Sequence, residues 1–351
     1  MKQRSKSKFK LPIKMHFDDG IHYNCNKYYS YSDLFLGLID GGRGIGKTTT
    51  FLIKGCLNVS KGEQFIYLRR YKPEIKKFVN KNSFNPIVDG VIYQGDGTGG
   101  YNVIYEKSII GYLIALSTAR SYKSVDFSKV TLIIFDEGIV RQTASYRYLE
   151  DEVIQFLEFV STVVRTRTNV RVVILGNNED IFSPYHAYFN IPVFQGVYID
   201  ADHGIYCEHA KNSQALLEEE RKTGLWKLIH DTSYGKYHYD NELLGLEDVK
   251  TGPKPVDAKL LARIIVNNQM LNIYTYVTKE QEIYLYLEHK EKLVKDNSTY
   301  TLVENNKYNY FNIDMYKKRL KNFIYRFYFH KKYTCNTQKG GAIITWVIEN
   351  I

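Results

Sequence analysis

One eight-residue segment near the N-terminus constrains the fold more than any other feature of the chain. Residues 41–48 read GGRGIGKT, which fits the phosphate-binding loop pattern G-x-x-x-x-G-K-[ST]. An apolar run at residues 34–39 precedes the segment, and a plausible helix begins near Thr48. This context matters because such a loop directs backbone N–H groups and a helix N-terminus at phosphate groups. The alternative, a glycine-rich turn without a ligand, explains the flanking strand and helix less well.

The same loop predicts which residues contact a nucleotide. Lys47 is expected to reach the β- and γ-phosphates, and the Thr48 hydroxyl is expected to bind Mg²⁺. The sequence contains no N-K-x-D element that would read guanine, so ATP is the expected nucleotide. The expected nucleotide-binding residues are Gly41, Gly42, Arg43, Gly44, Ile45, Gly46, Lys47, Thr48 and Thr49.

A second motif indicates hydrolysis of the nucleotide. Residues 131–137 read TLIIFDE, a buried-type strand that ends in two carboxylates. Asp136 is expected to bind Mg²⁺ through water, and Glu137 is expected to orient and deprotonate the attacking water. A glutamate directly after this aspartate is typical of the branch of ATPases that contains motors. The alternative is an acidic turn at the end of a strand, which would not account for the pairing with the loop at 41–48.

Two further positions are candidates for catalytic roles. Asn177 follows an apolar run at residues 170–175, where a polar side chain can contact the γ-phosphate or the attacking water; the alternative is a strand-ending turn. Arg165 lies at the end of a predicted helix over residues 148–166, where a cation gains about 0.3–1 kcal/mol from the helix dipole. Alternatively, Arg165 is an arginine finger for the ATP of a neighbouring subunit. Composition and spacing do not separate the two interpretations.

The order of apolar runs predicts an α/β fold. Short β-rich runs alternate with helical stretches over the first two-thirds of the chain, as in a parallel sheet. The expected strands are residues 34–39, 64–68, 113–116, 130–135 and 170–175. A Pro- and Gly-containing linker is expected at 251–255. After it, the runs at 260–266, 271–277 and 282–287 favour an antiparallel meander, and a helix is expected at 315–329.

Length and composition limit the organisation and the partners. The 351 residues suit two domains, or one domain with a sizeable appendage. The net charge of +10 favours a polyanionic partner, although basic charge alone does not prove one. No apolar stretch approaches the roughly 20 residues of a membrane span, so no membrane partner is expected. Four scattered cysteines argue against a disulfide framework.

Longer segments make the sequence recognisable. The loop at 41–48 is followed by GEQFIYLRRYKPE at residues 62–74, which is far more specific than a phosphate-binding loop. With IFDE at 134–137 and TVVRTR at 162–167, these segments resemble the DNA-packaging ATPases of small protein-primed podophages, the Salasvirus type. The resemblance continues through RKT at 221–223 and DTSYG at 231–235 and covers roughly residues 35–248.

This resemblance implies a ring ATPase, pentameric in relatives, that drives double-stranded DNA through the portal of an empty procapsid. It places Arg165 on the trans-acting arginine finger and Lys123 on a second basic residue at the subunit interface. Lys72 and Arg141 fall in loops that face the central pore and contact DNA, with Arg141 displaced one position by an insertion. A structural RNA is a candidate further partner. The implied location is the host cytoplasm, transiently at the procapsid portal vertex, and not the mature virion.

The resemblance also implies the fold class. It is a P-loop ATPase of the ASCE class with a central parallel sheet, then a small helical linker and a C-terminal α+β domain resembling a vestigial RNase H-like nuclease. The expected domains are residues 1–208, of which 1–30 form a basic irregular arm, then 209–250 and 251–351. The first C-terminal strand, 260–268, has no carboxylate, which argues against a two-metal nuclease. The rival hypotheses are a terminase-like enzyme that also cuts DNA and a non-catalytic nucleic-acid-binding scaffold.

Overall fold

The computed structural model describes residues 11–15, 19–140, 147–177, 183–189, 191, 194, 196–232, 235, 239, 250–266, 269–290, 292–294, 296–302 and 311–350. The chain forms two compact units. The first contains the described residues up to 140, those from 147 to 177 and those from 194 to 239. The second contains the described residues between 183 and 191 and those from 250 onward.

The first unit is built on a nine-stranded sheet in the order β3-β4-β5-β2-β6-β7-β1-β9-β8. Neighbouring strands from β5 to β9 in this order are all parallel, whereas β3, β4 and β8 are antiparallel additions at the two edges. The strands are β1 Leu36–Gly41, β2 Gln64–Arg69, β3 Ile92–Gly95, β4 Tyr101–Tyr105, β5 Ser108–Ala115, β6 Val130–Ile139, β7 Arg171–Gly176, β8 Val197–Asp200 and β9 Ile205–Ala210. The predicted parallel sheet is therefore confirmed.

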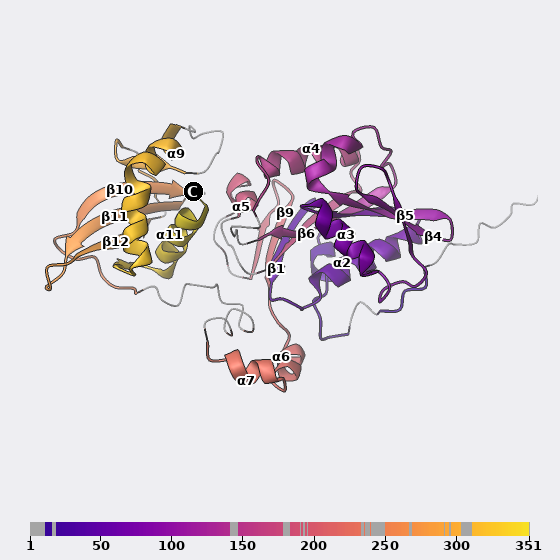
Figure 1. The fold of residues 1–351 in the computed structure, drawn as a ribbon, viewed down its shortest axis with the longest axis horizontal. Helices are drawn as coiled ribbons and strands as arrows, with labels where there is room; N and C mark the ends of the chain where they lie inside the picture. The colour runs from indigo at the N-terminus through magenta and orange to yellow at the C-terminus, as the bar shows by residue number, and fades with distance from the viewer. Residues whose placement is uncertain are drawn as a thin grey trace, which may run out of the picture. The chain divides into compact units, whose positions relative to one another are not determined.

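Helices cover both faces of this sheet because its central strands are apolar on both sides. Leu132 and Ile134 of β6 share a core with Phe51 of α2 (Lys47–Val59), and α3 (Lys72–Asn80) adds Ile75 to the same core. On the opposite face, Phe135 stacks on Phe156 of α4 (Glu152–Val164), with ring centroids 5.5 Å apart. Figure 1 shows α4 on one side of the strands and α2 and α3 on the other.

The sheet brings the predicted site residues to one edge. The register pairs Leu68 of β2 with Phe135 of β6, Phe135 with Ile174 of β7, and Ile174 with Leu38 of β1. The residues that follow these positions therefore meet at the carboxyl ends of four parallel strands, where ligands bind in open α/β sheets.

Parts of the first unit lie outside the predicted sheet elements. Leu11, Cys25 and Tyr28 of the predicted irregular arm are buried in the core, and a short helix α1 spans Asn26–Tyr29. Two short helices follow β9, α6 (Gln214–Glu220) and α7 (Gly224–Ile229), each capped by a side-chain hydroxyl. They lie within the predicted linker at 209–250, whereas β9 runs across the predicted boundary at 208. The domain boundaries remain predictions.

The second unit contains a five-stranded sheet in the order β13-β10-β11-β12-β14. Its strands β10 to β12 pair antiparallel, which confirms the predicted meander, while β13 and β14 run parallel to their neighbours. The strands are β10 Lys259–Val266, β11 Gln269–Val277, β12 Ile283–Lys290, β13 Thr299–Thr301 and β14 Tyr333–Cys335. The helices are α5 Pro184–Tyr188, α9 Phe311–Tyr316, the π-helical turn η3 Lys317–Lys321, α10 Asn322–Phe329 and α11 Gln338–Asn350.

One core joins the meander to α9, α10 and α11. Ile264, Leu271 and Leu285 of the sheet pack with Ile324 of α10 and Ile344 of α11. The helix predicted over 315–329 thus contains a π-helical turn, and α11 was not predicted. Within the described residues, no helix has the length and apolarity needed to cross a membrane.

Candidate ATP-binding and hydrolysis site

The loop between β1 and α2 has the backbone that its glycines allow. Gly44 and Gly46 adopt φ of +79° and +91°, in the left-handed region that favours glycine. Gly41 pairs with Ala210 of β9, and a Cβ atom at Gly41 would lie only 2.2 Å from the Ala210 carbonyl oxygen. The sequence therefore sets the loop geometry through three of its glycines.

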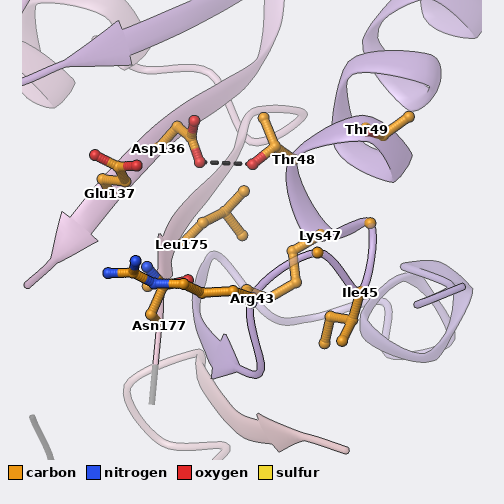
Figure 2. A pocket seen from close by; sticks show the side chains of 12 residues that line it. Arg43, Ile45, Lys47, Thr48, Thr49, Asp136, Glu137, Leu175 and Asn177 are labelled. Atoms are coloured by element: carbon orange, nitrogen blue, oxygen red, sulfur yellow. Dashed lines mark hydrogen bonds between the residues drawn. The ribbon is translucent and has the colours of Figure 1, made fainter. Parts of the chain in front are cut away.

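The loop, β6 and the end of β7 enclose a cavity of about 410 Å³ (Figure 2). Its lining residues are Arg43, Gly44, Ile45, Gly46, Lys47, Thr48, Thr49, Asp136, Glu137, Leu175, Gly176 and Asn177. Gly41 and Gly42 contribute differently, because their carbonyl oxygens accept hydrogen bonds of 3.0 and 2.7 Å from the Lys47 ammonium. The structure thus brings the predicted loop, the acidic pair and Asn177 together.

The Thr48 hydroxyl and the Asp136 carboxylate have the chemistry of a Mg²⁺ site. Thr48 Oγ1 donates a 2.7 Å hydrogen bond to Asp136 Oδ1, drawn as the dashed line in Figure 2. The described residues contain no cluster of three or more His, Cys, Asp or Glu able to hold a metal by themselves. Mg²⁺ prefers oxygen ligands and is usually bound by one or two carboxylates together with substrate phosphates. The residues present fit that requirement.

Arg69, which none of the sequence motifs includes as a site residue, joins the two acids. Its guanidinium donates to Asp136 Oδ2 at 2.9 Å, to Glu137 Oε2 at 2.5 Å and to Glu74 Oε1 at 2.7 Å. The Tyr67 hydroxyl donates to the same Asp136 oxygen at 2.7 Å. The sequence signal that could have identified Arg69 is its position at the end of a predicted strand, because the carboxyl ends of parallel strands lie at one edge of the sheet.

The donors that hold Asp136 keep their protons. Burial raises the pKa of Tyr67 well above its usual value, and the charge of Asp136 raises it further. Burial alone would lower the pKa of Arg69, but the negative groups around it, including Asp136, Glu137 and Glu74, outweigh this and raise it. Asp136 is therefore held by a neutral hydroxyl and a permanent cation.

Glu137 has an unusual backbone for a strand residue. Its φ is +52°, and the register between β6 and β7 shifts between Phe135 and Ile139. Such a bulge re-aims side chains and is common beside active sites. The Glu137 side chain remains 46% exposed and lines the cavity, so it is accessible to a water molecule there.

Three predicted residues within the described part of the chain do not line this cavity. Among the described residues, the lining excludes Lys72, Lys123 and Arg165, all of which are exposed. Lys72 begins α3, Lys123 follows the 3₁₀ helix η1 (Leu116–Tyr122), and Arg165 directly follows α4. Arg141 lies outside the described residues. The roles predicted for Lys72, Lys123 and Arg165 therefore concern surfaces beyond the subunit's own cavity. The roles of all four residues remain predictions.

The structure separates Arg165 from its neighbour Arg167. The Arg167 guanidinium donates to the carbonyl oxygens of Phe127, Ser128, Val130 and Val163 at 2.5–3.0 Å. Arg167 therefore ties the end of α4 to the start of β6. Arg165 has φ of +52°, which turns the chain at the end of α4, and its side chain is exposed.

Comparison with known proteins supports the predicted family. A family model described as the podovirus DNA encapsidation protein (Gp16) matches residues 17–333. The DNA packaging protein of Bacillus phage phi29 is 32% identical over 267 residues, covering 75% of this chain and 78% of the relative. The DNA packaging protein of Bacillus phage B103 is 33% identical over 258 residues, covering 73% of this chain and 79% of the relative.

Solved structures share the fold over nearly the whole chain. The bacteriophage Phi-29 viral genome packaging motor assembly matches with a TM-score of 0.59 and 24% identity, covering 93% of this chain and 98% of that one. The Phi-28 gp11 DNA packaging motor matches with a TM-score of 0.57 and 16% identity, covering 94% and 98%. The resemblance read from the sequence is confirmed, and the chain belongs to the podovirus DNA encapsidation protein (Gp16) family.

Proposed function

We propose that this chain hydrolyses ATP to drive double-stranded DNA into a procapsid through its portal. The observation that carries the proposal is the shared cavity of Lys47, Thr48, Asp136 and Glu137 at the carboxyl edge of a parallel sheet. The relatives are named DNA packaging proteins, and the structures with the same fold are DNA packaging motors. A scaffold that only binds DNA would need neither the paired acids nor the loop lysine.

The residues of the cavity have separable tasks. The α2 N-terminus and Lys47 bind the phosphates. Thr48 and Asp136 would hold Mg²⁺, which neutralises phosphate charge when it is bound. Glu137 accepts a proton from the attacking water, and Asn177 at the end of β7 contacts the γ-phosphate or that water. The hydrogen bond from Arg69 to Glu137 Oε2 limits rotation of the Glu137 carboxylate.

Further residues act in an assembled ring of five subunits. Arg165 completes the ATP site of the neighbouring subunit, and Lys123 acts at the same interface. Lys72 and Arg141 contact the DNA backbone in the central pore. The partners are double-stranded DNA, the portal and, as a candidate, a structural RNA. The ring works in the host cytoplasm at the portal vertex of the procapsid and is absent from the mature virion.

Two substitutions test the ATPase assignment. Glu137→Gln should bind Mg·ATP normally but lose about 10²–10⁴-fold in kcat, because an amide cannot accept the proton of the water. Lys47→Ala should weaken ATP binding as well as hydrolysis. Lys61→Ala, at an exposed lysine after α2, is the matched control and should change neither. Near wild-type turnover by Glu137→Gln would remove Glu137 from catalysis, and unchanged ATP affinity in Lys47→Ala would overturn the phosphate-loop assignment.

A further inference from the structure

Arg70 is a buried cation that the tasks described above do not use. It directly follows β2, and none of its surface is exposed. Arg69 points its guanidinium at the acids of the cavity, whereas Arg70 bonds to the backbone of the same segment. Adjacent residues of an extended strand project to opposite sides, which explains how two neighbouring arginines reach different parts of one segment.

The contacts of Arg70 converge on the strand end that carries Glu137. Its Nη1 donates to the Glu137 carbonyl at 3.0 Å, and its Nη2 donates to the Gly138 carbonyl at 2.9 Å. Its Nε and Nη2 also donate to the two carboxylate oxygens of Glu152 at 2.6 and 2.9 Å. The ring of Tyr148 lies 4.8 Å from the guanidinium carbon, and the Tyr148 hydroxyl accepts from and donates to the backbone of Val140.

These bonds fall where the sheet ladder is interrupted. The pairing of β6 with β7 shifts register between Phe135 and Ile139, and Glu137 within this interval has φ of +52°. A non-glycine residue in that conformation is strained and persists only when its surroundings hold it. Arg70 supplies N–H donors to two consecutive carbonyl groups of the bulge and so stabilises this backbone.

The ion pair with Glu152 is not explained by stability alone. Both side chains are almost fully buried, at 0% and 1% exposure. A buried ion pair often stabilises a fold no better than well-packed apolar residues would, because both charges lose their water. What the planar guanidinium adds is geometry, since it can bond a carboxylate and two carbonyl groups in fixed directions.

We propose that Arg70 is a positioning residue for ATP hydrolysis: it holds the bulge at Glu137 and Gly138 and thereby fixes the aim of the Glu137 carboxylate into the cavity. This inference rests on the proposed role of Glu137 as the base. Glu152 supports this role, because its carboxylate holds the Arg70 guanidinium at the first turn of α4. Arg70 acts through Glu137 and needs no contact with the nucleotide.

The decisive variant is Arg70→Lys in the full-length chain, which keeps the charge opposite Glu152 but loses the planar set of donors. We expect kcat for ATP to fall about 10–100-fold, a part of the 10²–10⁴-fold that a positioned base contributes. The dissociation constant of N-methylanthraniloyl-ATP should change by less than about twofold, because the phosphate-binding loop is untouched. The control is Arg171→Lys, since Arg171 also bonds backbone carbonyls, those of Tyr28, Tyr31 and Ser32, under tyrosine rings, and it should keep wild-type kcat.

A double-mutant cycle distinguishes positioning from general structural damage. In a Glu137→Gln background, Arg70→Lys should reduce the residual rate by less than about twofold, because the group it aims is already gone. The same factor of loss in both backgrounds would mean that Arg70 acts elsewhere and would overturn the inference. If Glu137→Gln is inactive while Arg70→Lys is fully active, the role of Arg70 is refuted and the role of Glu137 as the base stands. If Glu137→Gln is active, the proposed role of Glu137 as the base is itself refuted.

Glu152→Gln keeps the inference testable if Arg70→Lys does not fold. It retains Arg70 and the shape of its partner, but the amide oxygen can accept only one of the two bonds from Arg70, and the amide nitrogen cannot accept the other. We expect a smaller loss of kcat, about threefold to tenfold, again with nucleotide affinity unchanged and with the loss absent in the Glu137→Gln background. A folded Glu152→Gln protein with wild-type kcat would contradict the inference.

Discussion

The carboxylates of the two sheets lie in different surroundings. Strand β6 of the first unit carries Asp136 and Glu137 near its carboxyl end, where they line a cavity and share the guanidinium of Arg69. Strand β10 of the second unit, Lys259–Val266, carries no acid. The nearby Glu288 of β12 bonds to Asn272, Tyr274 and Lys290, and these bonds lower its pKa although burial alone would raise it.

This difference shows why a strand-end acid and an acid within a sheet have different uses. At the end of β6, the backbone leaves the ladder and the carboxylates face a cavity with room for a phosphate group. On β12, the carboxylate satisfies neighbouring side chains of its own sheet and is 15% exposed. We therefore expect ATP chemistry to depend on the first unit and the second unit to have no catalytic acid.

The largest effect should come from Arg165, which lies in the first unit but outside its cavity. Arg165→Ala should lower ATP turnover by about 10³–10⁵-fold if it stabilises the transition state in a neighbouring subunit. ATP binding should survive, and Arg165→Lys should not restore activity, because an ammonium lacks the planar fork of donors. Arg120→Ala, at an exposed arginine paired loosely with Glu158, is the control.

A mixing experiment locates the action of Arg165. Rings made from Arg165→Ala and Glu137→Gln subunits contain interfaces where an intact Glu137 site meets an intact Arg165. Some activity should return, with specific activity rising with protein concentration as rings assemble. An absence of recovery in rings shown to be mixed would mean that Arg165 acts on the ATP of its own subunit or only caps α4.

A smaller loss is expected when the cation between the two acids is removed. Arg69→Met should lower kcat about 10–100-fold, because groups that orient a ligand or a catalytic side chain typically contribute this much. The Mg²⁺ concentration at half-maximal activity should fall, since a competing cation no longer lies beside Asp136. A titration of activity against Mg²⁺ measures both quantities. An increased requirement for Mg²⁺ would show that Arg69 assists metal binding instead.

A modest, pH-dependent effect on stability is expected beside the phosphate-binding loop. Burial alone would lower the pKa of His209, but its 2.5 Å hydrogen bond to Asp40 and the Asp40 charge outweigh this, so the pKa is raised. The pair therefore stabilises the fold fully below the unfolded pKa of about 6.5 and loses this contribution as pH rises through the folded value. His209→Gln should lower Tm at pH 6 by roughly 2–4 °C per kcal/mol lost, with a smaller difference at pH 9.

The control for this pair is His203→Gln. His203 also lies near an aspartate, Asp200, but its side chain is 75% exposed, so its removal should not change Tm at either pH. A Tm difference for His209→Gln that grows as pH rises would mean that the pKa of His209 is lowered, not raised, by folding.

The smallest effects are expected in the second unit. Glu288→Gln should leave ATP turnover within about twofold of wild type, as substitutions away from a site usually do. The full-length protein should not nick supercoiled plasmid DNA in the presence of Mg²⁺ or Mn²⁺. Cleavage that Glu288→Gln abolishes would remove the contrast between the two sheets and favour the terminase-like alternative.

The first unit was predictable from the sequence where its signals are local. The loop at 41–48 and the strand ending at Asp136 and Glu137 are each recognisable within about ten residues, and the parallel sheet follows from their order. Arg69 and Arg70 could not be assigned in the same way, because their roles depend on β2 lying beside β6, a contact between residues that are far apart in the sequence.

Elsewhere, tertiary packing overrides the local signal. Helix α11 has a glycine pair in its first turn, at residues 340 and 341, which disfavours a helix, yet Ile343, Ile344 and Val347 bury one face of it in the core. The predicted strand 113–116 overlaps the buried end of the longer β5, which begins with two exposed residues at 108 and 109, and Leu116 starts the 3₁₀ helix η1 instead. The predicted helix 315–329 is present, but its π-helical turn leaves no mark in the spacing of the apolar residues.

The start of α2 links folding to the occupancy of the site. Gly46 stands in the capping position and has no side chain to accept the first N–H groups of the helix. A phosphate that accepts them is therefore the helix cap as well as part of the substrate. A ligand at 100 times its dissociation constant adds about 2.7 kcal/mol to the folded state. An empty subunit lacks this cap, so the first turn of α2 is held less firmly in it than in a subunit with a bound nucleotide.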